Sequence, residues 1–150
     1  MSNEVLQSKL VTKLRTDATL VTLTSHIAAD KRIAGAWPRT SRKTPFLAVT
    51  VRLGFGEVPE YPLITRYIVR LRAYGVTILE VTKIADRAKL LFAQRTSNSA
   101  FYDFSDSGIK VYQTAWRTRL EAKQVEYADG HVWEDENIIE IVADTSAVCP

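Results

Sequence analysis

The residue types that could carry catalysis are a few carboxylates with one nearby lysine. Asp103 and Asp106 precede a Glu121-Ala-Lys123 segment on a predicted strand. In nucleases with this kind of pattern, two carboxylates hold Mg²⁺ and the lysine helps to activate a water molecule. A Glu-x-Lys segment is equally typical of the solvent-exposed side of a β-hairpin. A Mg²⁺-dependent nuclease therefore stays open as an alternative function.

The other candidate motifs for chemistry are incomplete. His26 and His131 are the only histidines, and neither lies in a motif of a nucleophilic or zinc hydrolase. Residues 54–56 begin like a dinucleotide-binding loop, but Pro59 stands where a third glycine is needed and a strand follows. Cys149 is the only cysteine, which excludes an intrachain disulfide and a zinc site built on several cysteines. We expect no catalytic residue, no metal and no cofactor.

Arginines are the remaining chemically active group, and their spacing places them on one face of a sheet. Alternate residues of a strand point to opposite faces. The strand that ends at Gly75 alternates an apolar set with a mostly basic set: Tyr67, Val69, Leu71 and Ala73 against Arg66, Ile68, Arg70 and Arg72. The strand before it alternates in the same way: Leu47, Val49, Val51 and Leu53 against Phe46, Ala48, Thr50 and Arg52. Such a face meets solvent, a polyanion or a partner subunit.

A basic sheet that carries aromatic rings could bind nucleic acid by phosphate contacts and base stacking. The residues that would do so are Arg66, Arg70, Arg72, Arg117 and Arg119, with Tyr74 and Trp116. The acidic second half of the chain would lie beside this sheet and repel phosphate. We favour the alternative in which the arginine stems cover the sheet and their charged heads pair with acidic residues, within the chain or across a subunit interface.

The net charge of +3 is unevenly distributed along the 150 residues. Residues 1–75 contain 12 Lys/Arg and 5 Asp/Glu, whereas residues 76–150 contain 8 and 12. A nucleic-acid binder that is basic throughout does not have this pattern. A subunit whose basic surface meets an acidic surface of its neighbour does. The length fits one domain over residues 1–150, and no apolar run reaches the roughly 18 residues of a membrane span.

Three helices are expected. The first covers Asn3–Arg15, and the second covers Asp17–Leu23 with Asp17 as its N-terminal cap. The third runs from Thr77 to Phe92 and opens with a Thr-x-x-Glu capping box. Its apolar residues recur at helical spacing: Ile78, Val81, Ala85, Ala88 and Phe92. Between the second helix and the sheet, Asp30–Thr44 is expected to be irregular.

Four strands are expected, in two hairpins. The first hairpin pairs Pro45–Leu53 with Leu63–Gly75 across a Gly54–Pro62 loop that could project. After a Gln94–Gly108 loop, the second hairpin pairs Ile109–Val125 with Asn137–Ala143 across a turn at Ala128–His131. In the third strand Tyr112, Trp116 and Leu120 would face one side, with Gln113, Arg117 and Arg119 on the other. Two hairpins separated by a helix predict an α+β domain, a mostly antiparallel sheet with helices packed on one face.

The order of these segments also matches a known pattern. A short helix with Leu10 and Leu14 precedes an Asp17-Ala-x-Leu20 turn, and a basic segment leads to TPFLAVTV. A second strand ends in VRLRAYG, a long helix contains KIADRAKLLF, and the closing strand reads IEIVAD. Over Asn3–Asp144 the chain resembles the tail terminator, or tail completion, proteins of long-tailed bacteriophages and prophages.

This resemblance implies a structural protein and not an enzyme. Members of that family form a ring, commonly of six copies, that caps the finished tail tube, ends tube polymerisation and offers a surface to the head connector. The implied partners are further copies of the same chain, the tail tube protein, and the head–tail connector or stopper protein. DNA would only pass through the lumen, and no membrane is involved. The implied location is the tail or neck of the virion, after assembly in the host cytoplasm; another neck or baseplate component is the structural alternative.

A ring requires a heterologous contact, in which one patch of each subunit meets a different patch of the next. We expect Arg66, Arg70 and Arg72 to meet late acidic residues of the neighbouring subunit. These acidic residues are Glu134, Glu136 and Glu140. Phe55, Glu57 and Tyr61, in the Gly54–Pro62 connection, are expected to contact the tube or the connector.

Overall fold

The structure is a computed structural model, and it describes residues 2–37, 44–58, 61–93, 110–127 and 130–144. The side chains of residues 2–5, 53–58, 61–65, 93, 110–115, 121, 126–127, 130 and 144 are outside the description. Its elements, in chain order, are α1 (Ser2–Leu14), α2 (Ala18–Thr24), β1 (Ile33–Ala34), β2 (Phe46–Val58), β3 (Tyr61–Gly75), α3 (Ile78–Ala93), β4 (Lys110–Tyr127) and β5 (Gly130–Asp144). The expected Gln94–Gly108 loop and most of the Ala128–His131 turn lie outside the described residues.

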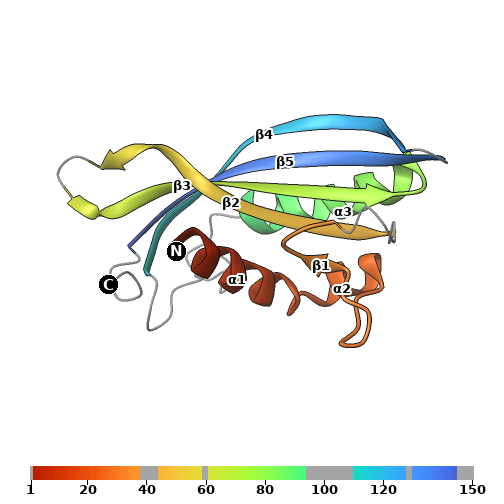
Figure 1. The fold of residues 1–150 in the computed structure, drawn as a ribbon, viewed down its shortest axis with the longest axis horizontal. Helices are drawn as coiled ribbons and strands as arrows, with labels where there is room; N and C mark the ends of the chain where they lie inside the picture. Colours follow the sequence, from red (N-terminus) through yellow and green to blue (C-terminus); the bar gives the residue numbers. More distant parts are fainter. Residues whose placement is uncertain (1, 38–43, 59–60, 94–109, 128–129, 145–150) are drawn as a thin grey trace.

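The strands form one sheet in the order β1-β2-β3-β5-β4. β2 with β3 and β4 with β5 are antiparallel hairpins, β3 pairs antiparallel with β5, and the short β1 is parallel to β2. In Figure 1 the strands pass in front of α3, while α1 lies beside β2. The predicted fold class is therefore confirmed: an α+β domain whose mostly antiparallel sheet has its helices packed on one face.

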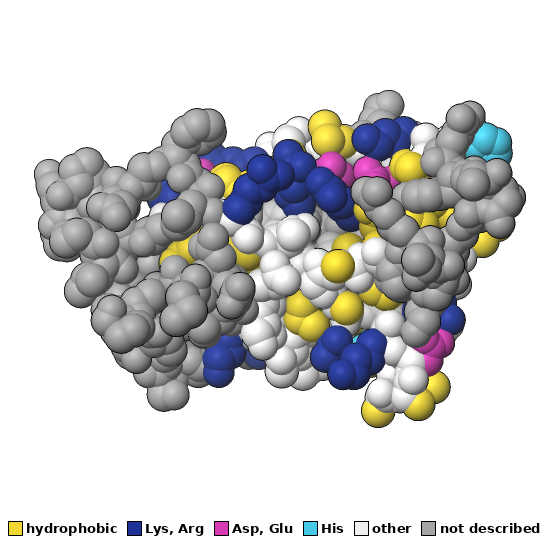
Figure 2. Space-filling view, viewed as in Figure 1, with side chains coloured by type: hydrophobic (Ala, Val, Ile, Leu, Met, Phe, Trp, Pro, Cys, Tyr) yellow, Lys and Arg dark blue, Asp and Glu magenta, His cyan; other side chains and the backbone are white. Residues whose placement is uncertain are grey.

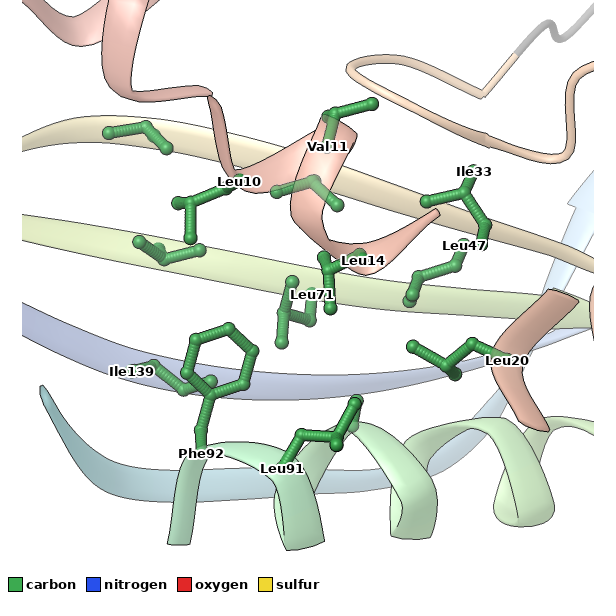
Figure 3. Close-up of a cluster of buried hydrophobic side chains, with 14 of the residues drawn as sticks. Leu10, Val11, Leu14, Leu20, Ile33, Leu47, Leu71, Leu91, Phe92 and Ile139 are labelled. Atoms are coloured by element: carbon green, nitrogen blue, oxygen red, sulfur yellow. The ribbon is translucent and has the colours of Figure 1, made fainter. Parts of the chain in front are cut away.

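The core fills the space between this sheet face and the helices. The apolar sets predicted from strand alternation are buried, including Val49 on β2 and Tyr67, Val69 and Leu71 on β3. In Figure 3, side chains from α1, α3 and the sheet converge, among them Leu14, Phe92 and Ile139. Each fully buried aliphatic or aromatic side chain of this kind contributes roughly 1.5–3 kcal/mol relative to an exposed one. The apolar stripe thus fixes which face of the sheet the helices cover.

The Gly54–Pro62 loop prediction is wrong. β2 continues to Val58 and β3 begins at Tyr61, so only residues 59–60 separate the two strands. The glycines and prolines predict a break between the strands, but the pairing instead shifts register between Leu53 and Glu57 and again before Val58. Bulges of this kind let a strand absorb glycine without ending. The result is a two-stranded arm that extends beyond the helices (Figure 1).

The last strand is also longer than predicted. β5 begins at Gly130, and its first residues pair with β4 as far as Tyr127. The acidic run Glu134–Glu136 gave no strand signal because Glu and Asp are unfavourable in strands. In the structure, each of its members faces a cation on a neighbouring strand. Cross-strand charge pairs therefore stabilise a segment that local propensity disfavours.

The prediction that Arg117 and Arg119 share one side of β4, opposite Trp116, is wrong. A register shift between Trp116 and Thr118 puts Trp116 and Arg119 on the helix side, with Arg117 on the other. Trp116 donates from Nε1 to Oδ1 of the buried Asn137 at 3.0 Å, and Lys89 of α3 lies 4.1 Å from the centre of its ring. The bulge thus removes Arg119 from the basic face that strict alternation predicted.

A second apolar cluster covers one end of the other sheet face. Phe46 and Ala48, expected on the solvent side, are buried there with Tyr74 and Val132. Trp37 stacks on Tyr74 with ring centres 4.3 Å apart and planes 7° from parallel. This covering comes from Trp37, which follows β1 in the Asp30–Thr44 segment. That segment is expected from the sequence to be irregular, but it contains the short strand Ile33–Ala34. No other described segment covers the rest of that sheet face.

The capping box at the start of α3 is confirmed in part. Thr77 Oγ1 accepts from Glu80 N at 3.2 Å, while Glu80 Oε2 accepts from the amide of Val76 rather than from Thr77. Ile78, expected in the buried stripe, is 49% exposed because it lies in the first turn, ahead of the sheet contact. In the described part of the chain, no helix is both long enough and apolar enough to cross a membrane.

Asp17 joins α2 to α3. Its carboxylate caps α2 by accepting from Leu20 N at 3.0 Å, as predicted, and it also accepts two hydrogen bonds from Arg87, at 2.7 and 3.0 Å. The Arg87 hydrogen bonds lower the pKa of Asp17 below its usual value of 3.8, against an opposing effect of burial. One carboxylate therefore ends one helix and fixes its position on another.

Asp17→Asn is expected to lower the free energy of unfolding by about 1–2 kcal/mol at neutral pH, because asparagine still caps α2 but loses the charged pair. Since the pKa of Asp17 is lower in the folded state, its contribution is complete above pH 3.8 and is lost as the pH falls below that value. Urea unfolding across this range measures both effects. Asp86→Asn, at a 60% exposed carboxylate, is the control and should cost less.

His26 fixes the chain just before β1. Its Nδ1 accepts from the backbone amides of Arg32 and Ile33 at 2.9 and 3.2 Å, so the proton of the neutral ring is on Nε2. Burial lowers the pKa of His26, and the charges of Arg15 and Lys31 lower it further, with Asp30 acting in the opposite direction. Protonation of Nδ1 would break both amide contacts.

Stability should therefore fall as the pH drops below about 6.5, because the unfolded chain then binds a proton at His26 that the folded chain does not. Thermal unfolding between pH 8 and pH 5 (a span of about three units around the histidine value) measures this loss. His26→Asn keeps an acceptor at the same position and should remove that part of the pH dependence. His131→Gln is the matched control; if it removed the dependence instead, the assignment to His26 would be wrong.

Candidate functional site

The predicted nuclease residues do not form a site within the described residues. Asp103 and Asp106 lie outside them, as does the side chain of Glu121. Lys123 has its ammonium 3.6 Å from Glu134 and is 62% exposed. Among the described residues, no three His, Cys, Asp or Glu side chains gather closely enough to hold a metal ion. The nuclease alternative stays untested.

The strongest candidate for function is the sheet face turned away from α1 and α3, which we call the open face. The strand register puts basic residues of three strands on it: Arg52, Arg66, Arg70, Arg72, Arg117 and Lys123. Three carboxylates of β5 share the same face: Glu134, Glu136 and Glu140. Figure 2 shows this side of the molecule, with a band of Lys and Arg side chains across it and acidic side chains beside the band.

Glu136 is the centre of the open face. Its Oε1 lies 3.2 Å from Arg70 Nε and 3.6 Å from Arg72 Nε, and its side chain is only 6% exposed. Glu136 Oε1 and Arg72 Nε are both buried, and neither makes a hydrogen bond with any described residue. The three groups are therefore held mainly by charge, and the carboxylate fixes two guanidinium groups above the sheet.

The other two carboxylates lie beneath cations of β4. Arg117 donates from Nη2 to Glu140 at 2.8 Å, and Lys123 is 3.6 Å from Glu134. The side chains of Glu134 and Glu140 are 13% and 16% exposed, whereas those of Lys123 and Arg117 are 62% and 50% exposed. The acids thus lie in the floor of the open face, and the cations form its solvent layer.

Arg52 and Arg66 complete this layer. Both are exposed, and neither has an ion-pair partner among the described residues. They lie toward the arm formed by β2 and β3, away from the Glu136 cluster. Among the side chains that the structure describes, the open face therefore carries six cations against three covered carboxylates, so this part of its solvent layer is positively charged.

Six predicted subunit-contact residues thus occupy one face of one chain: Arg66, Arg70, Arg72, Glu134, Glu136 and Glu140. Glu136 meets Arg70 and Arg72 of its own chain, which is the intrachain form of the arginine–acid pairing considered from the sequence. Contacts of these residues between copies stay a prediction. The sequence prediction named no specific partner within the chain because it began the last strand at Asn137; counting forward from the Asp129-Gly130 turn would have placed Glu134 opposite Lys123 of β4.

Arg119 forms a separate ionic cluster on the helix side. It donates to both oxygens of the buried Asp135, at 3.0 and 2.6 Å, and also to Asp86 of α3. The hydrogen bonds that Arg119 donates to Asp135 raise its pKa most; burial acts in the opposite direction, and the hydrogen bond to Asp86 raises the pKa further. This cluster fastens α3 to β4 and β5, so Arg119 has a structural role and does not face a ligand on the open face.

Two further surface features of the described residues lie at the arm and at the start of α3. Phe55 and Glu57 belong to β2 and Tyr61 to β3, all in the arm, and their side chains are outside the description. On the helix side, a groove of about 350 Å³ lies between α2 and α3. Its lining is Thr22, Leu23, Thr77, Leu79, Glu80 and Lys83. Leu79 is 64% exposed, and Val76 and Ile78 next to it are also exposed.

Comparisons with known proteins do not assign the chain to a family. No protein-family model matches it, and no curated protein matches it either.

Glu136→Gln is expected to lower the free energy of unfolding by about 1 kcal/mol, because Arg70 and Arg72 lose the carboxylate between them while both remain partly solvated. Urea unfolding at low and high salt measures the loss, which should shrink as salt screens the pair. Glu140→Gln, whose partner Arg117 is half exposed, is the control and should cost less. Equal losses for the two variants would contradict a central role for Glu136.

Proposed function

We propose that this chain is a structural subunit of a phage or prophage neck. It forms a homo-oligomeric ring of roughly six copies that caps the tail tube, ends tube polymerisation and joins the tail to the head connector. The observation that carries the proposal is the fold: one sheet with all described helices on one side, as the resemblance to tail terminator proteins implies. The expected location is the tail or neck of the virion.

A ring of this kind needs two different patches on each subunit. The basic and acidic halves of the chain do not supply them by charge alone, because the late acids are covered by arginines and a lysine of the same chain. The described residues do expose neighbouring large apolar side chains at the start of α3, namely Val76, Ile78 and Leu79. Exposed apolar clusters are typical of subunit contacts, so we assign one half of the ring contact to this segment.

The arm of β2 and β3 is the proposed contact with the tube or the connector. It extends beyond the helices, and a two-stranded ribbon is marginally stable without a partner. Phe55, Glu57 and Tyr61 lie along it. In a ring, six such arms would point in equivalent directions, which suits a contact with another ring-shaped assembly.

The test of the ring is the native mass of the purified chain by light scattering, with negative-stain images of the same fraction. We expect a species of about six times the 16.9 kDa of one chain, with ring-shaped particles. A monomer at every concentration and salt condition would contradict a ring that closes on its own.

The contact residues are tested with two matched variants. Leu79→Glu should give a folded monomer, because it places a charge in the proposed contact but leaves the core unchanged. Leu120→Glu makes the same change at a side chain that is 45% exposed on β4, and should still form rings. Rings from both variants would move the contact away from the start of α3 without contradicting the ring itself.

A further inference from the structure

We propose that the open face binds the phosphate backbone of duplex nucleic acid, without reading its sequence. This goes beyond the proposed ring and does not depend on it, because it is argued from the charges of a single chain. The first step is the layering of charge. Side chains of Arg70, Arg72, Arg117 and Lys123 are 31–62% exposed, whereas the three carboxylates beneath them are 6–16% exposed. An approaching ligand therefore meets guanidinium and ammonium groups first.

A second copy of the chain does not offer the matching acidic surface within the described residues. Asp17 is held by Arg87, Asp86 by Arg119, and Glu80 by the amide of Val76. The acids of β5 lie under the open face itself. Among the described residues, the positive layer therefore meets no matching acidic surface, and an external polyanion fits it better than these surfaces of a neighbouring copy do.

The composition of the face favours phosphate over an acidic protein surface. Protein interfaces depend on a few exposed apolar or aromatic anchors at their centre. Among the described residues, Leu120 is the one large apolar side chain of the open face that is strongly exposed, and it lies on the edge strand β4. The aromatic rings at the end of the face, Trp37 and Tyr74, are buried and stacked on each other. They cannot stack on bases, which favours duplex over single-stranded nucleic acid.

The dimensions of the face suit a backbone contact. Arg66 and Arg72 are six residues apart on β3, which corresponds to about 20 Å along the strand. From β2 to β4 the face crosses three strand spacings, about 14 Å. Duplex DNA carries about twelve phosphates over a 20 Å length. Because five of the six cations are arginines, several phosphates can be contacted at once by forked donors.

The test is fluorescence anisotropy with a labelled duplex of about 20 base pairs, titrated with the full chain at several salt concentrations. We expect binding that weakens steeply with salt, with a dissociation constant of roughly 10⁻⁴ to 10⁻⁶ M at physiological salt. Arg52→Gln with Arg66→Gln removes two exposed cations that have no ion-pair partner among the described residues, so folding should be unaffected. The slope of log K against log salt should become less steep by about 1.8.

Lys31→Gln with Lys83→Gln is the matched control, because it removes the same charge at exposed positions away from the open face. This variant should keep the slope of the wild-type chain. A shallower slope of log K against log salt in both variants, or in neither, would overturn the assignment to the open face.

Tighter binding of a single strand than of the duplex would contradict backbone recognition. Binding of polyglutamate but not of duplex would replace the proposal with an acidic protein partner. The native mass of each variant, measured in parallel, separates failure of this proposal from failure of the ring.

Discussion

The antiparallel pairing of β3 with β5 is the constraint on which the rest of the structure depends, because it joins the two hairpins into one sheet. Its register puts Val69 opposite Ile139 on the helix side and Arg72 opposite Glu136 on the open face. A shift of one residue would turn the apolar set outward and the charged set into the core. The same pairing therefore determines both what the helices cover and which charges meet on the other side.

The polar groups buried at the helix side make this register specific. Asn137 accepts from Trp116 of β4 and donates to the carbonyl of Ala85 in α3 at 2.9 Å, so one amide connects three elements. Asp135 of β5 is connected to the same two elements, because it accepts from Arg119 of β4, and Arg119 also donates to Asp86 of α3. A buried group left without these partners would cost more free energy than the contacts contribute. Alternative placements of α3 are disfavoured for this reason.

The two proposed functional surfaces are kept apart by this arrangement. The apolar start of α3 belongs to the helix side, and the positive layer belongs to the open face. Contacts between copies and contacts with a polyanion can therefore occur together without competing for the same residues. The arm adds a third surface at one end of the sheet, well separated from α3 in Figure 1.

The sequence by itself determined the fold class, the caps at Asp17 and Thr77, and the buried faces of β2 and β3, because these follow from periodicity and from hydrogen bonds between near neighbours. It could not determine the partner of Arg70 and Arg72, since Glu136 lies more than sixty residues away and meets them only through the β3–β5 register. Nor could it show that a bulge turns Arg119 toward α3 or that the glycines after Leu53 continue a strand. A bulge changes which face every later residue occupies, and only the paired strand fixes where it falls.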